Sequence, residues 1–143
     1  DGLGQYRKVQ LLRTPKSAET ATAEQKYWRK FKNVTLTKGY SPVYDIDFCP
    51  TSPYDFAVTN STRVQVYGTR GKSVKKTVTR FKDVVYSCSF RHDGRLMVAS
   101  GEESDVKVLD MGSRDLLRTL KGHKGPVHST RFCSGRLHAI SGG

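Results

Sequence analysis

An internal repeat with a period of about 42 residues constrains the fold of this 143-residue chain more than any other feature. Val43, Val85 and Val127 are equally spaced by one period, and each begins a six-residue segment that ends in phenylalanine. The same offset relates four further pairs: Val64 and Val106, Val66 and Val108, Thr77 and Thr119, and Val78 and Leu120. Self-similarity at a fixed period of this length is the sequence signature of a repeat architecture.

Each period has the pattern of short strands. An Asp93-Gly94 pair separates two apolar runs, which indicates a β-hairpin. Further strands are expected at 96–100, 106–109 and 116–120. Four strands in roughly 42 residues is the size of a β-propeller blade. A parallel β-helix needs shorter coils, and a helical solenoid needs a 3.6-residue periodicity that these segments lack.

These strands carry a family resemblance. The segment 90–101, followed by Val106 to Asp110 and then by Gly122-His123, resembles a WD repeat. The chain departs from the family pattern in its polar positions, where Arg80-Phe81 replaces one Gly-His pair and Glu103 replaces the turn aspartate. The Trp-Asp dipeptide is likewise Leu109-Asp110 in one repeat and Tyr67-Gly68 in the other. We therefore expect an incomplete hydrogen-bond network.

The stability of the blades should then depend on apolar packing. The side chains expected to provide it are Val85, Phe90, Leu96, Val98, Val106, Val108 and Leu120.

The predicted fold class is all-β, a WD-repeat β-propeller with about two and a half blades and an N-terminal arm. The expected divisions are an arm at 1–39, a first blade at 40–81, a second at 82–123 and the start of a third at 124–143. A closed propeller needs four or more blades. We therefore expect the remaining blades to be missing from this chain.

The arm does not share the repeat. Residues 6–12 resemble a strand, and residues 18–31 suggest a short helix with an aromatic stripe. Tyr27, Trp28 and Phe31 are interleaved with four cations, which are Lys26, Arg29, Lys30 and Lys32. Such a surface can stack on bases and bind phosphates. Alternatively, the aromatic rings pack on the propeller wall while the cations face water, and we favour this packing.

The net charge of +12 is concentrated in two blocks. Residues 1–39 carry a net charge of +6 and residues 61–82 a net charge of +7, whereas residues 40–60 carry −3. A positive surface attracts polyanions such as RNA or DNA, although a solvated face is the alternative. The second block consists of Arg63, Arg70, Lys72, Lys75, Lys76, Arg80 and Lys82.

We expect Arg70 and Lys72 to lie in an exposed loop and Lys75 and Lys76 on the outermost strand, where lysine also discourages edge pairing. Contact with RNA phosphates or with acidic partner proteins is the functional alternative, through backbone attraction rather than base readout.

No motif favours catalysis or cofactor binding. The segment Arg70 to Ser73 lacks the glycine that a phosphate-binding loop needs five residues before Gly71, because that position is Val66. The four histidines show no metal-ligand spacing. We predict no enzyme, cofactor or metal.

The cysteines and the hydropathy pattern favour a compartment without disulfides or membranes. Cys49, Cys88 and Cys133 form no C-x-x-C pair, which favours a reducing compartment, and Cys88 and Cys133 should be buried or half-buried. No apolar run reaches the length of about 18 residues that a bilayer requires, so we expect no membrane span.

The arm sharpens the resemblance. Tyr27 to Lys32, and Arg80 to Asp83 running on to Asp110, are similar to the N-terminal part of the U3 small nucleolar RNA-associated family of WD-repeat proteins. That resemblance implies a non-catalytic scaffold of the small-subunit processome in the nucleus and nucleolus, acting in pre-rRNA processing and 18S rRNA maturation. It also implies other processome proteins and the pre-rRNA 5′ external transcribed spacer as partners, with no small-molecule substrate. A generic WD-repeat adaptor in another complex is the alternative, and an enzyme using the Gly-Lys-Ser loop is a more distant one.

Overall fold

A computed structural model describes residues 21–32, 35–69, 73–135 and 137–143, which belong to two separate compact units, 1–34 and 35–143. In the first unit, helix α1 covers Ala23–Arg29. Thr22 and Gln25 form a capping box, in which each side chain accepts a hydrogen bond from the other's backbone N–H, at 3.2 and 3.3 Å. The helix is therefore shorter than the predicted 18–31, and the predicted strand at 6–12 lies outside the described residues.

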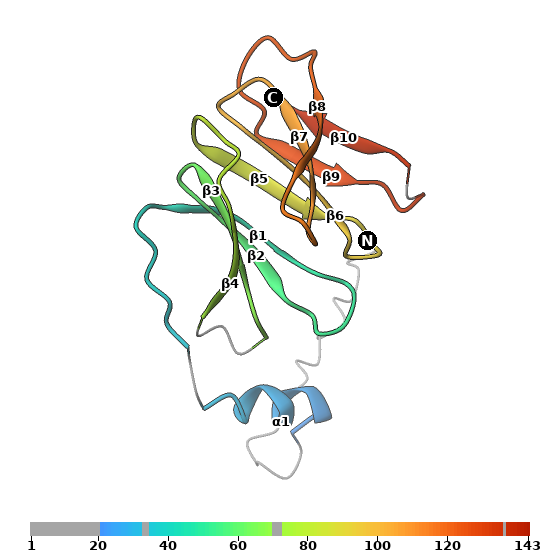
Figure 1. The fold of residues 1–143 in the computed structure, drawn as a ribbon. Helices are drawn as coiled ribbons and strands as arrows, with labels where there is room; N and C mark the ends of the chain where they lie inside the picture. Colours follow the sequence, from blue (N-terminus) through green and yellow to red (C-terminus); the bar gives the residue numbers. More distant parts are fainter. Residues whose placement is uncertain (1–20, 33–34, 70–72, 136) are drawn as a thin grey trace, which may run out of the picture. The chain divides into compact units, whose positions relative to one another are not determined.

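The second unit is built from antiparallel sheets whose strands follow chain order (Figure 1). Two sheets have four strands, in the orders β1-β2-β3-β4 and β5-β6-β7-β8, and the third pairs β9 with β10. The strands are β1 (Val43–Phe48), β2 (Phe56–Asn60), β3 (Arg63–Tyr67), β4 (Val74–Val78), β5 (Val85–Phe90), β6 (Leu96–Gly101), β7 (Val106–Asp110), β8 (Leu116–Leu120), β9 (Ser129–Phe132) and β10 (Ala139–Gly142).

The shifts in strand register also recur with the period of the repeat. The β3–β4 pairing shifts register between Val66 and Tyr67, and the β7–β8 pairing shifts between Val108 and Leu109, one period later. The β1–β2 and β5–β6 pairs both shift directly after their first paired residue. Equivalent residues therefore occupy equivalent places in the two sheets, as repeated propeller blades require.

The sheets are arranged like neighbouring blades. β1 contacts β5, and β5 contacts β9, so the first strands of the three sheets lie side by side in chain order (Figure 1). This arrangement confirms the predicted partial propeller, with two complete four-stranded sheets and two strands of a third among the described residues. The blade limits at 81/82 and 123/124 stay predictions.

The turn between β5 and β6 is the hairpin that the Asp93-Gly94 pair predicts. Gly94 has a φ of +69°, a conformation that favours glycine. The Asp93 carboxylate accepts a hydrogen bond from the backbone N–H of Arg95 at 3.0 Å and pairs with the Arg91 guanidinium. A side chain at Gly94 would also clash with the side chains of Cys49 and Thr51 in the β1–β2 connection, so the turn packs against that connection.

Each pair of neighbouring sheets encloses its own hydrophobic cluster. The larger cluster lies between the first and second sheets, and a smaller one lies between the second and third. The first contains Cys49, Ala57, Val64, Val66, Val78, Val85, Cys88, Phe90, Met97, Ala99, Leu109 and Met111, and the second contains Val98, Val106 and Val127, with Phe132 packed against it.

Among the seven side chains expected to provide apolar packing, Leu120 departs most from the prediction. Leu120 is 44% exposed, and Leu96 and Val108 are only half-buried. The prediction also missed Met97 and Leu109, which are fully buried. Strand β6 is buried on both faces, so the alternation that marks a half-buried strand does not apply to it.

Burial of a given repeat position depends on whether a neighbouring sheet covers it. Val78 is 1% exposed, whereas its counterpart Leu120 is 44% exposed. Val78 packs against the complete second sheet, but only two described strands follow the second sheet.

The first sheet shows the same effect on its other face. Val43, Ile46 and Phe48 are 48%, 52% and 66% exposed, while their counterparts in the second sheet are all buried. The first strand of the first sheet and the last strand of the second sheet therefore each present apolar side chains to solvent.

Gly101 allows the closest backbone approach between two sheet segments. A Cβ at this position would clash with the Val84 carbonyl, and a Cβ at Gly143, one period on, would clash in the same way with the Pro126 carbonyl. The N–H of Glu102 donates to that Val84 carbonyl at 2.9 Å. Glycine thus occupies this place in the second and third sheets, whereas the first sheet has Asn60 opposite Val43 instead.

Gly101→Ala should destabilise the full-length protein by about 1–3 kcal/mol, because the added methyl group meets backbone rather than a movable side chain. Thermal and denaturant unfolding measure the effect. Gly122→Ala is the matched control, since nothing lies within 4 Å of its Cβ position. Equal stability of the two variants would contradict this packing.

Candidate partner- and RNA-binding surfaces

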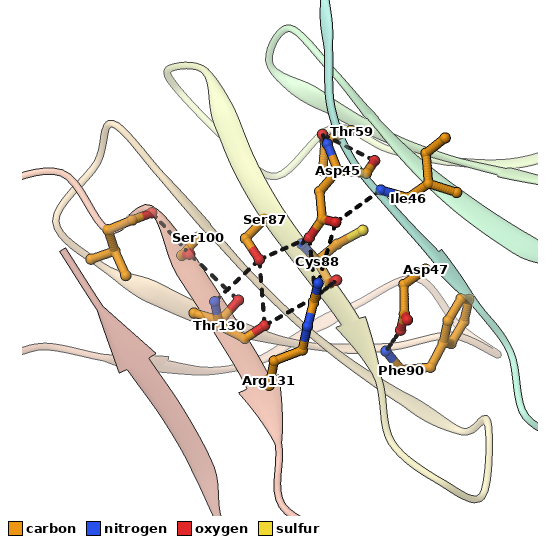
Figure 2. Close-up of polar contacts among 11 residues, drawn as sticks. Asp45, Ile46, Asp47, Thr59, Ser87, Cys88, Phe90, Ser100, Thr130 and Arg131 are labelled. Carbon is orange, nitrogen blue, oxygen red and sulfur yellow. Dashed lines mark hydrogen bonds and ion pairs between the residues drawn. The ribbon is translucent and has the colours of Figure 1, made fainter. Parts of the chain in front are cut away.

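We call β1, β5 and β9, the first strands of the three sheets, the inner strands. A carboxylate on β1 receives hydrogen bonds from β5. Asp45 accepts from the Ser87 hydroxyl at 2.9 Å and from the backbone N–H of Cys88 at 3.1 Å (Figure 2). Asp47 accepts from the N–H of Phe90 at 2.6 Å in the same way. Because β1 and β5 belong to different sheets, these bonds join blades through their first strands.

The same contact recurs one blade later. The backbone N–H of Thr130 donates to the Ser87 hydroxyl at 3.1 Å, which is the Cys88-to-Asp45 contact moved by one period (Figure 2). The Ser100 hydroxyl adds a bond to the carbonyl of Val127 at 3.1 Å. Inner strands β5 and β9 therefore each have backbone N–H groups that are satisfied by side chains of the preceding blade.

Arg131 completes this polar chain. Its guanidinium lies 3.1 Å from the Asp45 carboxylate, and it donates to the Cys88 carbonyl at 2.8 Å, so it reaches from the third sheet across the second to the first (Figure 2). Burial raises the pKa of Asp45, but hydrogen bonds from Arg131, Cys88 and Ser87 outweigh burial and hold that pKa below its ordinary value of 3.8. Burial likewise raises the pKa of the Cys88 thiol, which favours its neutral form.

A second polar network surrounds Glu103, the residue that takes the place of the turn aspartate. Glu103 accepts from the backbone N–H of Lys82 at 3.2 Å and forms an ion pair with Lys107. The Lys107 ammonium also donates to the Arg80 carbonyl at 2.8 Å and lies 4.9 Å from the centre of the Phe81 ring. The Lys107 side chain is only 8% exposed, so these partners compensate for burying its charge.

The surroundings of Phe81 explain why this residue can stand where the repeat pattern has the histidine of a Gly-His pair. His123 is its counterpart one period on, and the His123 ring nitrogen lies 2.8 Å from the Ser141 hydroxyl. In the second blade the equivalent pair is Phe81 and Ala99, both apolar, and Phe81 packs against the buried cluster that contains Ala99. In the second blade, the contact between Lys107 and the Phe81 ring therefore replaces the hydrogen bond that the histidine makes in the third.

Three cations of the predicted basic block have partners within the fold. Lys75 lies 2.7 Å from the Asp55 carboxylate, and Arg80 lies 3.4 Å from that of Asp115. Lys76 is half-buried and donates to the carbonyl of Met111 in the next sheet. Lys75 and Lys76 do lie on β4, the outermost strand of the first sheet, as predicted. These contacts give both lysines a structural role.

The fold distributes the basic block over both ends of the sheets. One end holds the turn at 61–62 and the connections at 79–84 and 121–126, and we call it the β4–β5 end. Arg63 begins β3 at this end and Lys82 lies in the β4–β5 connection, both exposed. Lys75, by contrast, lies near the start of β4 at the opposite end. Arg70 and Lys72, which are predicted to lie in an exposed loop, fall outside the described residues.

The repeat brings a further cation to the β4–β5 end that the sequence prediction missed. Lys124 is the counterpart of Lys82, and both are exposed in equivalent connections of consecutive blades. Lys121 is exposed in the same connection as Lys124. In the described part of the chain, no ion pair engages the side chain of any of these three lysines. The constant repeat offset was the signal that could have identified Lys124.

The segment 26–32, which includes the end of helix α1, carries the other predicted basic residues. Its three aromatic rings contact one another, with Trp28 and Phe31 stacked at 5.3 Å and Tyr27 edge-on to Trp28 at 5.4 Å. They are 58–63% exposed, and the flanking Lys26, Arg29, Lys30 and Lys32 are exposed as well. Aromatic and basic side chains therefore share the surface of this unit, and packing of the rings on the propeller wall stays a prediction.

Neither a metal centre nor a membrane helix is found in the described ranges. No group of three or more histidine, cysteine, aspartate or glutamate side chains there is placed to hold a metal ion. The single described helix is too short to cross a bilayer.

Comparison with known families agrees with this geometry. Residues 72–110, which contain most of the second sheet, match the family described as WD domain, G-beta repeat. Together with the sheets arranged as blades, this match identifies the chain as a WD-repeat protein.

Its homologues carry the name U3 small nucleolar RNA-associated protein 15. The Schizosaccharomyces pombe protein of that name is 49% identical over 112 residues, which are 78% of this chain and 23% of the relative. The Saccharomyces cerevisiae protein is 43% identical over 121 residues, or 84% of this chain and 24% of the relative. The Gallus gallus homolog is 38% identical over 140 residues, or 98% and 27%. The chain thus spans about a quarter of the length of these relatives.

Replacing Asp45 by Asn should destabilise the protein by about 1–3 kcal/mol, because the buried donors on β5 and the partly exposed Arg131 guanidinium lose a charged acceptor. A lowered native pKa means that the ionised carboxylate stabilises the fold above about pH 4, and that this stabilisation is lost as the pH falls through the native pKa. The difference in unfolding free energy between wild type and variant should therefore shrink below about pH 4.

Asp115→Asn is the control, since its side chain is 60% exposed and pairs with Arg80 only at the surface. Denaturant titrations from neutral pH downward compare the three proteins. A pH-independent gap between wild type and Asp45→Asn would contradict the role of the ionised carboxylate.

Proposed function

We propose that this chain is part of a non-catalytic scaffold of the small-subunit processome. It acts in pre-rRNA processing and 18S rRNA maturation, in the nucleus and nucleolus. Its sheets contact other processome proteins, and its basic surfaces contact pre-rRNA, with the 5′ external transcribed spacer as the RNA segment. The observation that carries this proposal is the sequence identity of 34–49% to proteins named for their association with the U3 small nucleolar RNA.

The exposed cations support the RNA part of the proposal. Lys82 and Lys124 repeat on consecutive blades at the β4–β5 end, and Arg63 lies at the same end. Cations spaced along one side of a protein attract a phosphate backbone without reading its bases. Helix α1 adds exposed lysine and arginine beside aromatic rings, a combination that suits single-stranded RNA.

The architecture supports the protein-contact part. The connections between the described strands present exposed polar residues. Repeat proteins commonly use such rigid surfaces as platforms for other chains.

The double charge reversal Lys82→Glu with Lys124→Glu should weaken crosslinking of the full-length protein to pre-rRNA several-fold, because two phosphate-binding cations become repulsive. Thermal stability should change by less than about 0.5 kcal/mol, since both side chains are exposed. Ultraviolet crosslinking in cells, followed by sequencing of the bound RNA, measures the effect. Reversal of Lys75 or Lys76 is a poorer test, because these lysines hold contacts within the fold.

Arg95→Glu with Arg118→Glu is the matched control. It makes the same change in net charge at exposed side chains, one in the 91–95 turn at the opposite end of the sheets and one on β8. If both double variants lower crosslinking equally, net charge rather than the β4–β5 end attracts the RNA. Failure of pre-rRNA and processome proteins to co-purify with the wild type would count against the proposal as a whole.

A further inference from the structure

An aromatic ladder runs across the first strands of the three sheets. It consists of Tyr44, Tyr86 and His128, which are separated by one period each and so occupy the same position of each repeat. The rings of Tyr44 and Tyr86 meet edge to face with centroids 5.1 Å apart, and those of Tyr86 and His128 stack at 5.1 Å with an interplanar angle of 26°. The repeat therefore places one ring per blade in a continuous row.

The ladder is open to solvent. Tyr44 is 53% exposed, Tyr86 is half-buried and His128 is exposed. Tyr44 and Tyr86 are the second residues of β1 and β5, which begin at the β4–β5 end. The apolar clusters between the sheets do not include these rings, so core packing does not account for them.

The charges around the central ring are negative. The Tyr86 hydroxyl donates to the Glu102 carboxylate at 2.6 Å, and Asp83 also lies close enough to act on the ring electrostatically. The hydrogen bond to Glu102 raises the pKa of Tyr86 to about 12, with Asp83 contributing in the same direction. In a chain with a net charge of +12, this is a locally acidic and aromatic surface.

Aromatic faces beside carboxylates favour a cationic ligand. A guanidinium group stacks on tyrosine and histidine rings and pairs with carboxylates at its edge, whereas a phosphate would be repelled by Glu102 and Asp83. Arginine fits better than lysine because its planar group can lie against a ring while its N–H donors reach a carboxylate.

We propose that the ladder of Tyr44, Tyr86 and His128, with Glu102 and Asp83 at its edge, is a docking site for an arginine-bearing segment of a partner protein. The inference rests on the protein-contact part of the proposed scaffold function. It assigns the ladder to protein recognition, while the exposed lysines of the same end are assigned to RNA.

The test measures binding of fluorescein-labelled peptides to the full-length protein by fluorescence anisotropy. The probes are a Gly/Ser peptide with two arginines, its lysine and citrulline counterparts, and a labelled oligouridine. The arginine peptide should bind best and the neutral citrulline peptide least. Tyr44→Ala and Glu102→Gln should each weaken binding of the arginine peptide by about threefold or more, with oligouridine binding unchanged.

Tyr54→Ala is the matched control, because Tyr54 is 60% exposed but lies in the β1–β2 connection at the opposite end of the sheets. It should bind the arginine peptide like the wild type, and thermal unfolding verifies that all variants fold. Equal binding by wild type and Tyr44→Ala, or no binding by the wild type, would overturn the docking site. So would a loss confined to oligouridine, which would assign the ladder to RNA. Since the crosslinking of Lys82 and Lys124 is measured separately, either outcome is distinguishable from failure of the scaffold proposal.

Discussion

The hydrogen bond from a backbone N–H of one inner strand to a side chain of the preceding inner strand is the interaction on which the arrangement of sheets depends. Asp45 receives it from Cys88, and Ser87 receives it from Thr130. Apolar packing between sheets is strong but tolerates sliding, whereas these bonds are directional. They fix the position of each sheet against the next, and the buried clusters pack between faces held in that register.

Much of the fold follows from local sequence signals. The Asp93-Gly94 turn, the short apolar strand segments and the constant offset of Val43, Val85 and Val127 can be read from the residues alone. Such signals are legible without tertiary information, because turn chemistry and strand periodicity depend on neighbouring residues. The predicted strands of the second blade accordingly match β5 to β8 closely.

Features that depend on a neighbouring sheet were not predictable in the same way. Leu120 has an apolar side chain, as core residues do, yet its exposure depends on how many strands lie beside it. Lys107 has a charged side chain, as surface residues do, yet it is buried because Glu103 and the Phe81 ring contact its ammonium group. The basic block looked continuous along the chain, but antiparallel strands return Arg63 and Lys82 to the β4–β5 end and place Lys75 at the opposite end.

The two uncovered apolar faces have a consequence for biosynthesis. A nascent polypeptide that has folded only these sheets displays Phe48 on one side and Leu120 on the other. Hydrophobic surfaces of this kind are adhesive while translation is under way, and chaperones commonly shield them. A polypeptide that presents these two faces during synthesis is therefore expected to benefit from such shielding.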